Sequence, residues 1–586
     1  MIAPRVRPVL AESAAWVASS ALAGALLVYP TSFVRPPVAD MESAEVIQPF
    51  GLFGVMFVAW ALAMLTLLVL RARHPPRSAG NVAFVALFAA VFWGFWIKNT
   101  PWGGGFDSLY TAGIARYVQD FGRVSPGIAN LVYFDFPGLH IVAAGLGLAS
   151  GLDALVVATL LRMTFAVLGA AAVYCSIALV VDSSALALIG AVLFIQGNII
   201  HVATAFIFFP AVLGLVLLET LWLYAMVGQL AGGRLPEAIG FLIVFVSLAV
   251  SHFVTSATAV VIVGVLAALR LTGRSRELPW QGALRVLVVV AVLVAWEAYW
   301  TVSNFKSLIL SLADFHFGFT GPQQSLQGGF LELPEWATAT RMVWLALAAG
   351  FVLVALLRIA HRRTLTTPVQ WLYACGLVGV LLAGGLATVM SEERRQFSRL
   401  IYLPPLCSIP LVLGLFLARR RLSRVLVTVS VALLAVTALP SFLVSQHGVY
   451  TSSVPDDQVA VGRYLEQLYG EGAGLSAYGN FNAARAGVFA YFTRSATIRS
   501  HDRFERATFW PAEDALLDEF MEQGSGGCRR VFVFEERSRT ALYRMTYAIE
   551  PEDPRWDTVR EDLAGSANLV YANGNGRVYV PAMCSA

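Results

Sequence analysis

Residues 50–70 read FGLFGVMFVAWALAMLTLLVL, and this run decides the class of fold. It contains no charged residue, and a helix needs about 20 apolar residues to cross the hydrocarbon core of a bilayer. Arg71, Arg73 and Arg77 follow directly, as expected of a short loop on the cytoplasmic side. Similar runs recur along the 586 residues, of which 58% are hydrophobic and 13% charged. Because these runs do not alternate apolar and polar residues, they exclude a β-barrel and predict a polytopic α-helical membrane protein.

Arginine-rich loops set the expected topology. They recur at 270–285, 358–363 and 419–424, and the positive-inside rule places all of them in the cytoplasm. The runs between them predict about thirteen spans, with the N-terminus inside and the C-terminus outside. The expected spans lie near 12–34, 50–70, 81–98, 138–152, 154–181, 184–197, 199–227, 238–269, 286–303, 341–358, 368–390, 401–418 and 425–445. Two of them, 138–152 and 184–197, are short, which leaves a re-entrant arrangement open for both.

This topology divides the chain into a transmembrane domain, residues 1–445, and an extracytoplasmic domain, residues 446–586. The outer loops 99–137, 304–340 and 391–400 face the same side as the second domain. That domain carries VPDDQVAVGRYLEQLYG with helical periodicity, the apolar strand sequence VFVFEE, and LVYANGNGRVYV, a hairpin pattern with an Asn-Gly turn. It is predicted to be a small soluble α/β domain packed over the membrane part.

The five cysteines fall into two groups. Cys528 and Cys584 lie in the predicted outer domain, where an oxidising compartment favours a disulfide between them. Cys175, Cys375 and Cys407 lie in predicted spans, where packing as small apolar residues is the simpler role. No Cys/His spacing typical of a structural zinc site is present in the sequence.

The first outer loop contains the leading candidate for chemistry. FDSLY (106–110) opens a helical stretch there, and Asp107 has two roles open to it. Its carboxylate can cap the helix by accepting from first-turn N–H groups, or it can act on a substrate just outside a span. We take Asp107 as the first candidate catalytic carboxylate. Tyr110 and Arg116, on the same helical stretch, are candidates to line the site.

Two further motifs carry polar residues beside or within apolar runs. YFDFPGLH (133–140) supplies Asp135 as a second candidate catalytic carboxylate, with a turn or capping role as an equal alternative. It also places His140 where it can line the site, although a lone membrane histidine is more often a packing residue. SHFVTS (251–256) places His252 in a long apolar run. For His252 a hydrogen bond between helices is the more frequent role, and donor binding is the alternative.

Arginines on the predicted outer side form the phosphate-binding candidate. SEERRQFSRL (391–400) breaks the positive-inside rule, and its two glutamates neutralise only part of its positive charge. A guanidinium fork matches phosphate oxygens, so Arg394, Arg395 and Arg399 are candidates to bind a lipid phosphate. In the loop 304–340, Lys306 is a further donor-binding candidate and His316 a residue that lines the site.

The chain resembles the GT-C superfamily of membrane glycosyltransferases, which use polyprenyl-phosphate sugars and often carry a soluble C-terminal domain outside the cell. The resemblance covers the architecture over most of the chain and rests on FDSLY, YFDFPGLH, SHFVTS and ERRQFSRLIYLPP. It implies that Asp107 is the catalytic carboxylate, which takes the proton of the acceptor hydroxyl. It also implies that Arg394, Arg395 and Arg399 hold the departing lipid phosphate. Two features differ from the family: two more spans precede the loop, and FDSLY holds one Asp instead of an adjacent acid pair.

The resemblance predicts an inverting glycosyltransferase in the plasma membrane of a prokaryote. It would move a sugar from a polyprenyl-phosphate donor to a glycan, lipid or protein acceptor outside the membrane. Membrane lipids surround it, nucleic acid is no partner, and a divalent cation stays open as cofactor. A transporter or flippase of lipid-linked sugars is one alternative, and a non-catalytic envelope scaffold is the other. The sequence contains no Walker A loop and no GxGxxG unit, so a nucleotide cofactor is not indicated.

Overall fold

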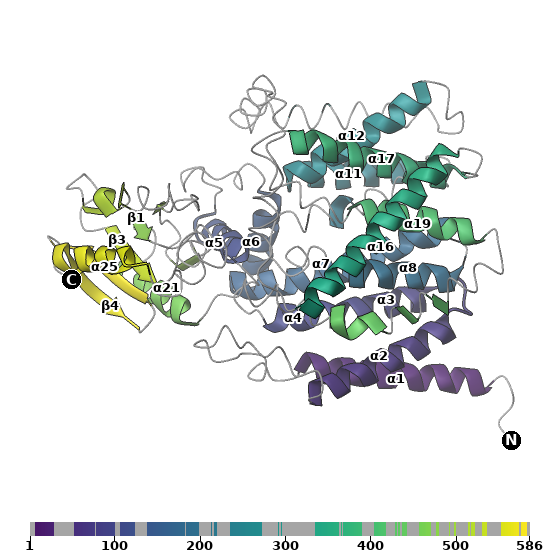
Figure 1. The fold of residues 1–586 in the computed structure, drawn as a ribbon, viewed down its shortest axis with the longest axis horizontal. Coiled ribbons are helices and arrows are strands. Elements are labelled where there is room, and N and C mark those ends of the chain that lie inside the picture. The colour runs from purple at the N-terminus through teal and green to yellow at the C-terminus, as the bar shows by residue number, and fades with distance from the viewer. Residues whose placement is uncertain are drawn as a thin grey trace.

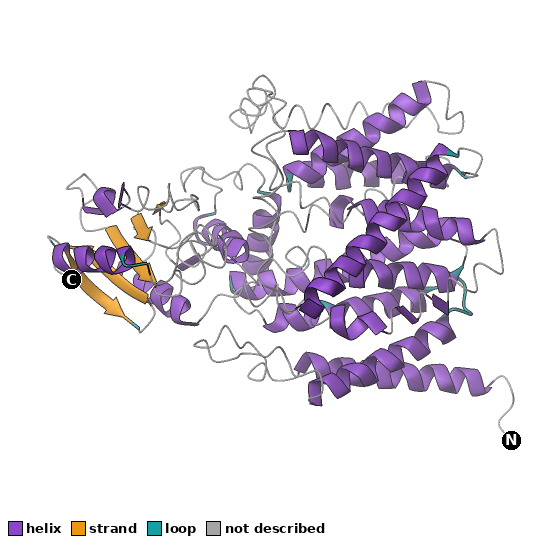
Figure 2. Ribbon diagram, in the orientation of Figure 1, coloured by secondary structure: helices purple, strands orange, loops and turns teal. Residues whose placement is uncertain are grey.

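The computed structural model shows a bundle of helices with a β-sheet beyond one end (Figure 1, Figure 2). The structure describes residues 6–28, 52–76, 78–99, 106–122, 137–181, 183–197, 213, 216–218, 235–271, 291, 295, 335–361, 365, 367–389, 403–417, 428–429, 432–433, 436–441, 456–469, 476–479, 491–492, 497–499, 514–515, 517–521, 530–535, 553–573 and 576–582.

Helices, most of them apolar, build the bundle. They are α1 (Val6–Val28), α2 (Leu52–Arg71), α3 (Ala79–Phe92), α4 (Gly94–Asn99), α5 (Phe106–Phe121), α6 (Gly138–Ser150), α7 (Ala154–Val180), α8 (Ser184–Gly197), α11 (Leu235–Ala249), α12 (Phe253–Leu271), α16 (Glu335–Ala360), α17 (Pro368–Val389) and α19 (Leu403–Leu417). Within the described residues, four helices are long and apolar enough to cross a bilayer, and they contain Ala11–Val28, Leu52–Arg71, Ala154–Val180 and Met342–Ala360. The predicted class of helical membrane protein is confirmed.

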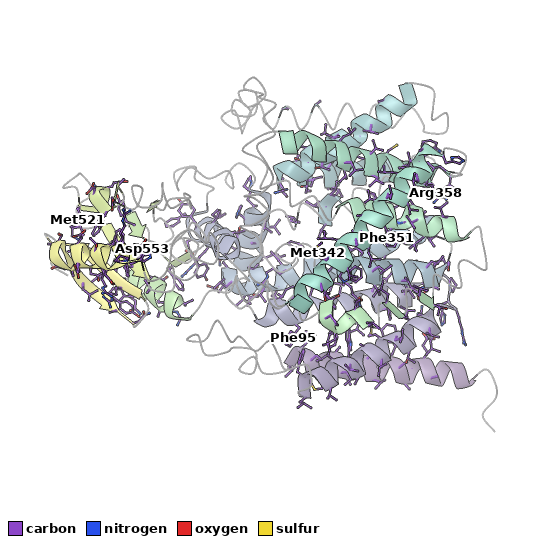
Figure 3. All side chains as sticks on the ribbon, viewed as in Figure 1. Phe95, Met342, Phe351, Arg358, Met521 and Asp553 are labelled. Atoms are coloured by element: carbon purple, nitrogen blue, oxygen red, sulfur yellow. The ribbon has the colours of Figure 1, made fainter. Side chains whose placement is uncertain are left out.

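The end of the bundle that carries Arg71 and Arg358, here called the arginine-rich end, lies opposite the sheet. Arg71 at the end of α2 pairs with Glu12 of α1 at 2.7 Å, and the Tyr174 hydroxyl near the end of α7 donates to the carbonyl of Pro76. Arg358, near the end of α16, lies far from the labelled residues of the C-terminal part (Figure 3). Helices from both halves of the chain therefore end together at this face.

α6 does not cross the bundle, so the structure favours the re-entrant arrangement that the sequence left open for 138–152 over a full span. Leu139 at its beginning and Ala154 just beyond its end belong to one buried cluster with Val459 and Phe492 from the C-terminal part of the chain. The helix has 13 residues, or about 20 Å, and Asp153 just beyond its end accepts from the hydroxyl of Tyr491 in the C-terminal region, so both ends lie beside that region. α7, with 27 residues and a length of about 40 Å, then runs to the arginine-rich end.

The predicted span at 238–269 is corrected, because the structure divides it into α11 and α12. Residues 250–252 separate the two helices, and Ser251 and His252 are buried at the break. The apolar run predicted as one span thus forms two helices. The sides expected for the later loops stay a prediction. The total of about thirteen spans stays a prediction.

The C-terminal region, residues 456–582, contains the described strands. α21 (Asp456–Tyr469) precedes β1 (Ser476–Gly479), β2 (Thr497–Arg499) and β3 (Arg530–Glu535), and α25 (Arg555–Ser566) precedes β4 (Ala567–Ala572) and β5 (Gly576–Pro581). The strand order is β2-β1-β3-β5-β4. β1 pairs in parallel with β2 and β3, whereas β5 pairs antiparallel with β3 and β4. The predicted helix, the strand VFVFEE and the hairpin LVYANGNGRVYV are confirmed as elements.

The sheet buries both of its faces. Phe532 and Phe534 of β3 pack in a cluster with Trp556 of α25, whereas Val531 and Val533 pack with α21 on the other face. This alternation follows from the period of two along a strand. α21 therefore lies on the sheet, and Val459 of the same helix packs in the cluster that also contains residues of α5, α6 and α7.

Candidate functional site

α5 carries the leading candidate residue at its beginning. The helix starts at Phe106, so the backbone of Asp107 and Tyr110 lies in its first turns, and their side chains are not among those described. Ala112 and Ala115, one turn apart, are fully buried, because small side chains let the helix approach its neighbours closely. The predicted helix in the outer loop is confirmed.

α5 and α6 pack along their length with their first turns at the same end. A Cβ placed at Gly147 in the last turn of α6 would lie 2.9 Å from Gln119 Oε1 in the last turn of α5. Ala112 of α5 and Leu139 of α6 belong to one buried cluster further along the same pair. The beginning of α6 is therefore brought to the end of α5 that carries Asp107.

The beginning of α6 contacts the break between α11 and α12. The backbone N–H of Gly138 donates to the carbonyl of Val250 at 3.0 Å. A Cβ at Gly138 would lie 2.5 Å from Ser251 Oγ and 3.0 Å from that carbonyl oxygen, so only glycine fits here without a shift. Through this contact the structure joins two motifs, YFDFPGLH and SHFVTS, that lie more than 100 residues apart.

His252 has a defined local role at this break. Its Nδ1 accepts from the backbone N–H of Thr255 at 3.3 Å and lies 3.1 Å from the Thr255 hydroxyl. Because a backbone N–H is always a donor, Nδ1 is unprotonated, and a neutral ring carries its proton on Nε2. His252 thus satisfies a first-turn donor of α12, as a capping residue does.

Two buried polar side chains lie near the same helix beginnings. His140, in the first turn of α6, is fully buried. Neither of its ring nitrogens has a hydrogen-bond partner within the described residues, and the same holds for Thr111 Oγ1 of α5. A buried polar group without a partner costs about 1–3 kcal/mol. Within the described residues, His140 and Thr111 therefore have polar atoms near the beginnings of α5 and α6 that could bind a ligand.

The C-terminal region contacts α5 through Arg116. One guanidinium nitrogen lies 3.0 Å from Glu466 Oε1 of α21, and the guanidinium carbon lies 4.9 Å from the ring centre of Tyr491. The Tyr491 hydroxyl donates to Asp153 Oδ1 at 2.7 Å. Burial raises the pKa of Tyr491, and the hydrogen bond to Asp153 raises it further. Arg116, predicted to line the site, is held by residues of the C-terminal region.

Sequence reasoning missed the partners in this network. Glu466 and Tyr491 follow Arg116 by more than 300 residues, and no local pattern marks them. Asp153 had a readable signal, because Gly151 ends α6 in the left-handed region (φ 69°) and Asp153 caps α7 by accepting from the Leu155 N–H. A Gly followed closely by Asp between two apolar runs is typical of such a helix junction.

The remaining predicted site residues lie outside the described part of the chain. They are Asp135, Lys306, His316, Arg394, Arg395 and Arg399, together with the predicted disulfide pair Cys528 and Cys584. Among the described residues, no group of three or more His, Cys, Asp or Glu could hold a metal ion. The divalent cation left open by the sequence therefore gains no candidate ligands from this part.

Comparison with protein-family models gives no match, and comparison with curated proteins gives none. Solved structures do match. The crystal structure of ArnT from Cupriavidus metallidurans bound to undecaprenyl phosphate has a TM-score of 0.52 at 14% identity, and the match covers 86% of this chain and 98% of ArnT.

Two further structures match at lower scores. The archaeal oligosaccharyltransferase AglB from Archaeoglobus fulgidus has a TM-score of 0.49 at 12% identity, covering 86% of this chain and 74% of AglB. Arabinofuranosyltransferase AftD from Mycobacteria has a TM-score of 0.48 at 13% identity, covering 86% of this chain and 40% of AftD. All three are GT-C membrane glycosyltransferases. The likeness to ArnT spans nearly the whole of that enzyme, and this chain therefore has a GT-C-like fold.

Proposed function

We propose that this protein is an inverting glycosyltransferase that moves a sugar from a polyprenyl-phosphate donor to an acceptor outside the membrane. The fold supports glycosyl transfer in general, because it is shared with ArnT, whose structure contains undecaprenyl phosphate. The observation that carries the proposal is the meeting of α5, α6 and the break before α12 at one end of the bundle.

This meeting suits an anionic donor. The first turns of α5 and α6 lie at the same end, and Gly138 joins them to the segment that begins α12. Helix N-termini present unpaired N–H groups and a partial positive charge, which favour phosphate. The polar atoms of His140 and Thr111 that have no hydrogen-bond partner among the described residues lie on the same two helices. The arrangement therefore supports a phosphate-bearing lipid as the substrate class.

In the proposed reaction, Asp107 acts as the general base. The acceptor hydroxyl oxygen forms a bond to the anomeric carbon of the sugar while the bond from that carbon to the phosphate oxygen breaks. The electron pair leaves with the lipid phosphate, and the hydroxyl proton passes to the carboxylate. Attack from the face opposite the leaving phosphate inverts the anomeric centre. Asp135 is the second candidate for this role.

Arg394, Arg395 and Arg399 are proposed to hold the lipid phosphate, with Lys306 and His252 as further donor-binding residues. Positive charge fixed near the leaving phosphate stabilises the charge that grows there during transfer. Tyr110, His140 and His316 complete the proposed lining. The acceptor class, whether glycan, lipid or protein, is left to the assay.

The test is sugar transfer by the purified full-length protein from a panel of polyprenyl-phosphate sugars to glycan, lipid and peptide acceptors. We expect Asp107→Asn to lower kcat by about 10²–10⁴, the usual contribution of a general base, with donor binding unchanged. Asp120→Asn is the matched control, because Asp120 is an exposed carboxylate near the other end of the same helix. It should leave transfer at the wild-type rate.

Three outcomes separate the proposal from its alternatives. Equal loss in both variants, or none in either, would remove Asp107 from its role. Donor binding without transfer by the wild type would favour a transporter or flippase of lipid-linked sugars. Neither binding nor transfer across the panel would favour a non-catalytic scaffold.

A further inference from the structure

Arg116 connects the proposed catalytic helix to the C-terminal region. It lies on α5, nine residues after Asp107, which is about two and a half helical turns. Its guanidinium pairs with Glu466 Oε1 at 3.0 Å and donates to the backbone carbonyl of Tyr491 at 3.5 Å. Both partners belong to the C-terminal region, so one side chain crosses from the bundle to the sheet-bearing part.

Tyr491 extends this connection to α7. The cation of Arg116 lies over its ring at 4.9 Å, and its hydroxyl donates to Asp153 Oδ1 at 2.7 Å. The same Asp153 oxygen accepts from the N–H of Leu155 at 2.8 Å and so caps α7. Tyr491 therefore bridges a charge on α5 and the cap of α7, at a position where it is only 3% exposed.

An apolar contact surrounds these polar ones. Val459 of α21 and Phe492 pack in one cluster with Ala112 and Ala115 of α5. The side chains of Arg116 and Glu466 are only 18% and 27% exposed, so water screens their attraction less than it would on an open surface. The apolar contact thus fixes the position of α5, and the ion pair between Arg116 and Glu466 fixes its rotation about its own axis.

We propose that Arg116 is a positioning residue: through Glu466 and Tyr491, the C-terminal region fixes the orientation of α5 and with it the placement of Asp107 at the site. The part of this proposal that concerns Asp107 rests on the proposed function. The geometry assigns the C-terminal region a share in assembling the site, in addition to any contact it makes with an acceptor. A displacement of about 1 Å at a reacting group can cost about 10²-fold in rate.

The experiment compares Arg116→Gln, Glu466→Gln and the exchanged pair Arg116→Glu with Glu466→Arg, all in the full-length protein. Hydrogen exchange of peptides covering α5 measures how firmly that helix is held in place. The values of kcat and KM for sugar transfer measure how this affects catalysis. The matched control is Arg560→Gln, which removes an arginine from a more exposed pair with Asp557 on α25 of the same region. It should change neither readout.

We expect both single variants to speed exchange in α5 by about 10-fold and to lower kcat by about 10–100-fold with KM within about twofold. The exchanged pair should recover part of both losses, since it restores the ion pair but not the contact with the Tyr491 ring. Unchanged exchange in α5 would overturn the proposal. So would faster exchange with kcat unchanged, because the contact would then be structural only.

Failure of the proposed function gives a different result. If the wild type transfers no sugar from any donor, the glycosyltransferase proposal falls, and with it the placement of Asp107. Hydrogen exchange still decides whether Arg116 and Glu466 hold α5. The two failures are therefore distinguished in one set of samples.

Discussion

At Gly138 the motif YFDFPGLH comes into close contact with the beginning of SHFVTS. A Cβ there would meet Ser251 Oγ at 2.5 Å and the Val250 carbonyl oxygen at 3.0 Å, and a backbone atom cannot swing aside as a flexible side chain does. A methyl group at this position must displace the first turn of α6 or the break before α12.

We expect Gly138→Ala to destabilise the protein by about 1–3 kcal/mol, the usual cost of overpacking. The measurement is the thermal unfolding midpoint of the protein in detergent. Gly145→Ala on the same helix is the control, because nothing lies within 4 Å of a Cβ there. It should be neutral or slightly stabilising, since alanine restricts the unfolded chain. Equal effects of the two variants would contradict the close contact at Gly138.

Tyr491 makes the contact between the C-terminal region and α7 depend on pH. Burial raises the pKa of its phenol above the ordinary value of about 10, and Asp153 raises it further. A phenol whose pKa is higher in the folded protein contributes stability that is fully present below pH 10. That contribution is lost as the pH rises above 10 toward the folded pKa, because the unfolded chain then releases the proton more readily.

Tyr491→Phe should therefore cost about 1.5–3 kcal/mol near pH 7, the value of a hydrogen bond to a charged group. The difference between wild type and variant should stay constant from pH 7 to 9 and shrink above pH 10. Thermal unfolding across this range measures it. A difference that grows with rising pH would show that the sign of the pKa shift is wrong.

At the scale of elements, α6 is the segment for which the structure chooses between a full span and a re-entrant arrangement. Its 13 residues begin in the cluster that includes Val459 of the C-terminal region, and Asp153 just beyond its end accepts from Tyr491 of the same region. The loop between α6 and α7 therefore lies on the side of the sheet, whereas a crossing at 138–152 would have placed it in the cytoplasm.

Cysteine labelling tests this placement. Leu152 is 38% exposed in the loop after α6, and Leu152→Cys would be introduced after replacement of the five native cysteines. A membrane-impermeant thiol reagent should label it in spheroplasts. Arg73→Cys in the arginine-rich loop is the counterpart and should label only in inside-out vesicles. Labelling of both positions from the same side would show that α6 crosses the membrane.

At the scale of the whole molecule, the layers follow one another from the sheet to the arginine-rich end. The sheet packs on α21, α21 packs toward α5, and α5 packs on α6 and α7. α7 then reaches the loop that follows Arg71. A change at the sheet therefore has a continuous path of contacts to the helix that carries Asp107.

Part of this arrangement could be predicted from the sequence. The apolar runs predicted most helices of the bundle, including α2 and α7, and VFVFEE predicted β3, because helix and strand formation depend on patterns a few residues long. The details of two segments could not be read from hydropathy, because hydropathy measures only whether a segment avoids water. α6 avoids water without crossing the bundle, and the apolar run at 238–269 avoids it as two helices.

The sequence by itself determined that this is a helical membrane protein with strands near its C-terminus, because apolar length and side-chain period are local properties. Only the tertiary structure decided that Gly138 meets Ser251 and that Arg116 pairs with Glu466, 350 residues later in the chain. Such contacts depend on how packed elements close on one another. In the sequence, nothing distinguishes Arg116 from an ordinary loop arginine, because its partner Glu466 lies on α21, far away in the chain.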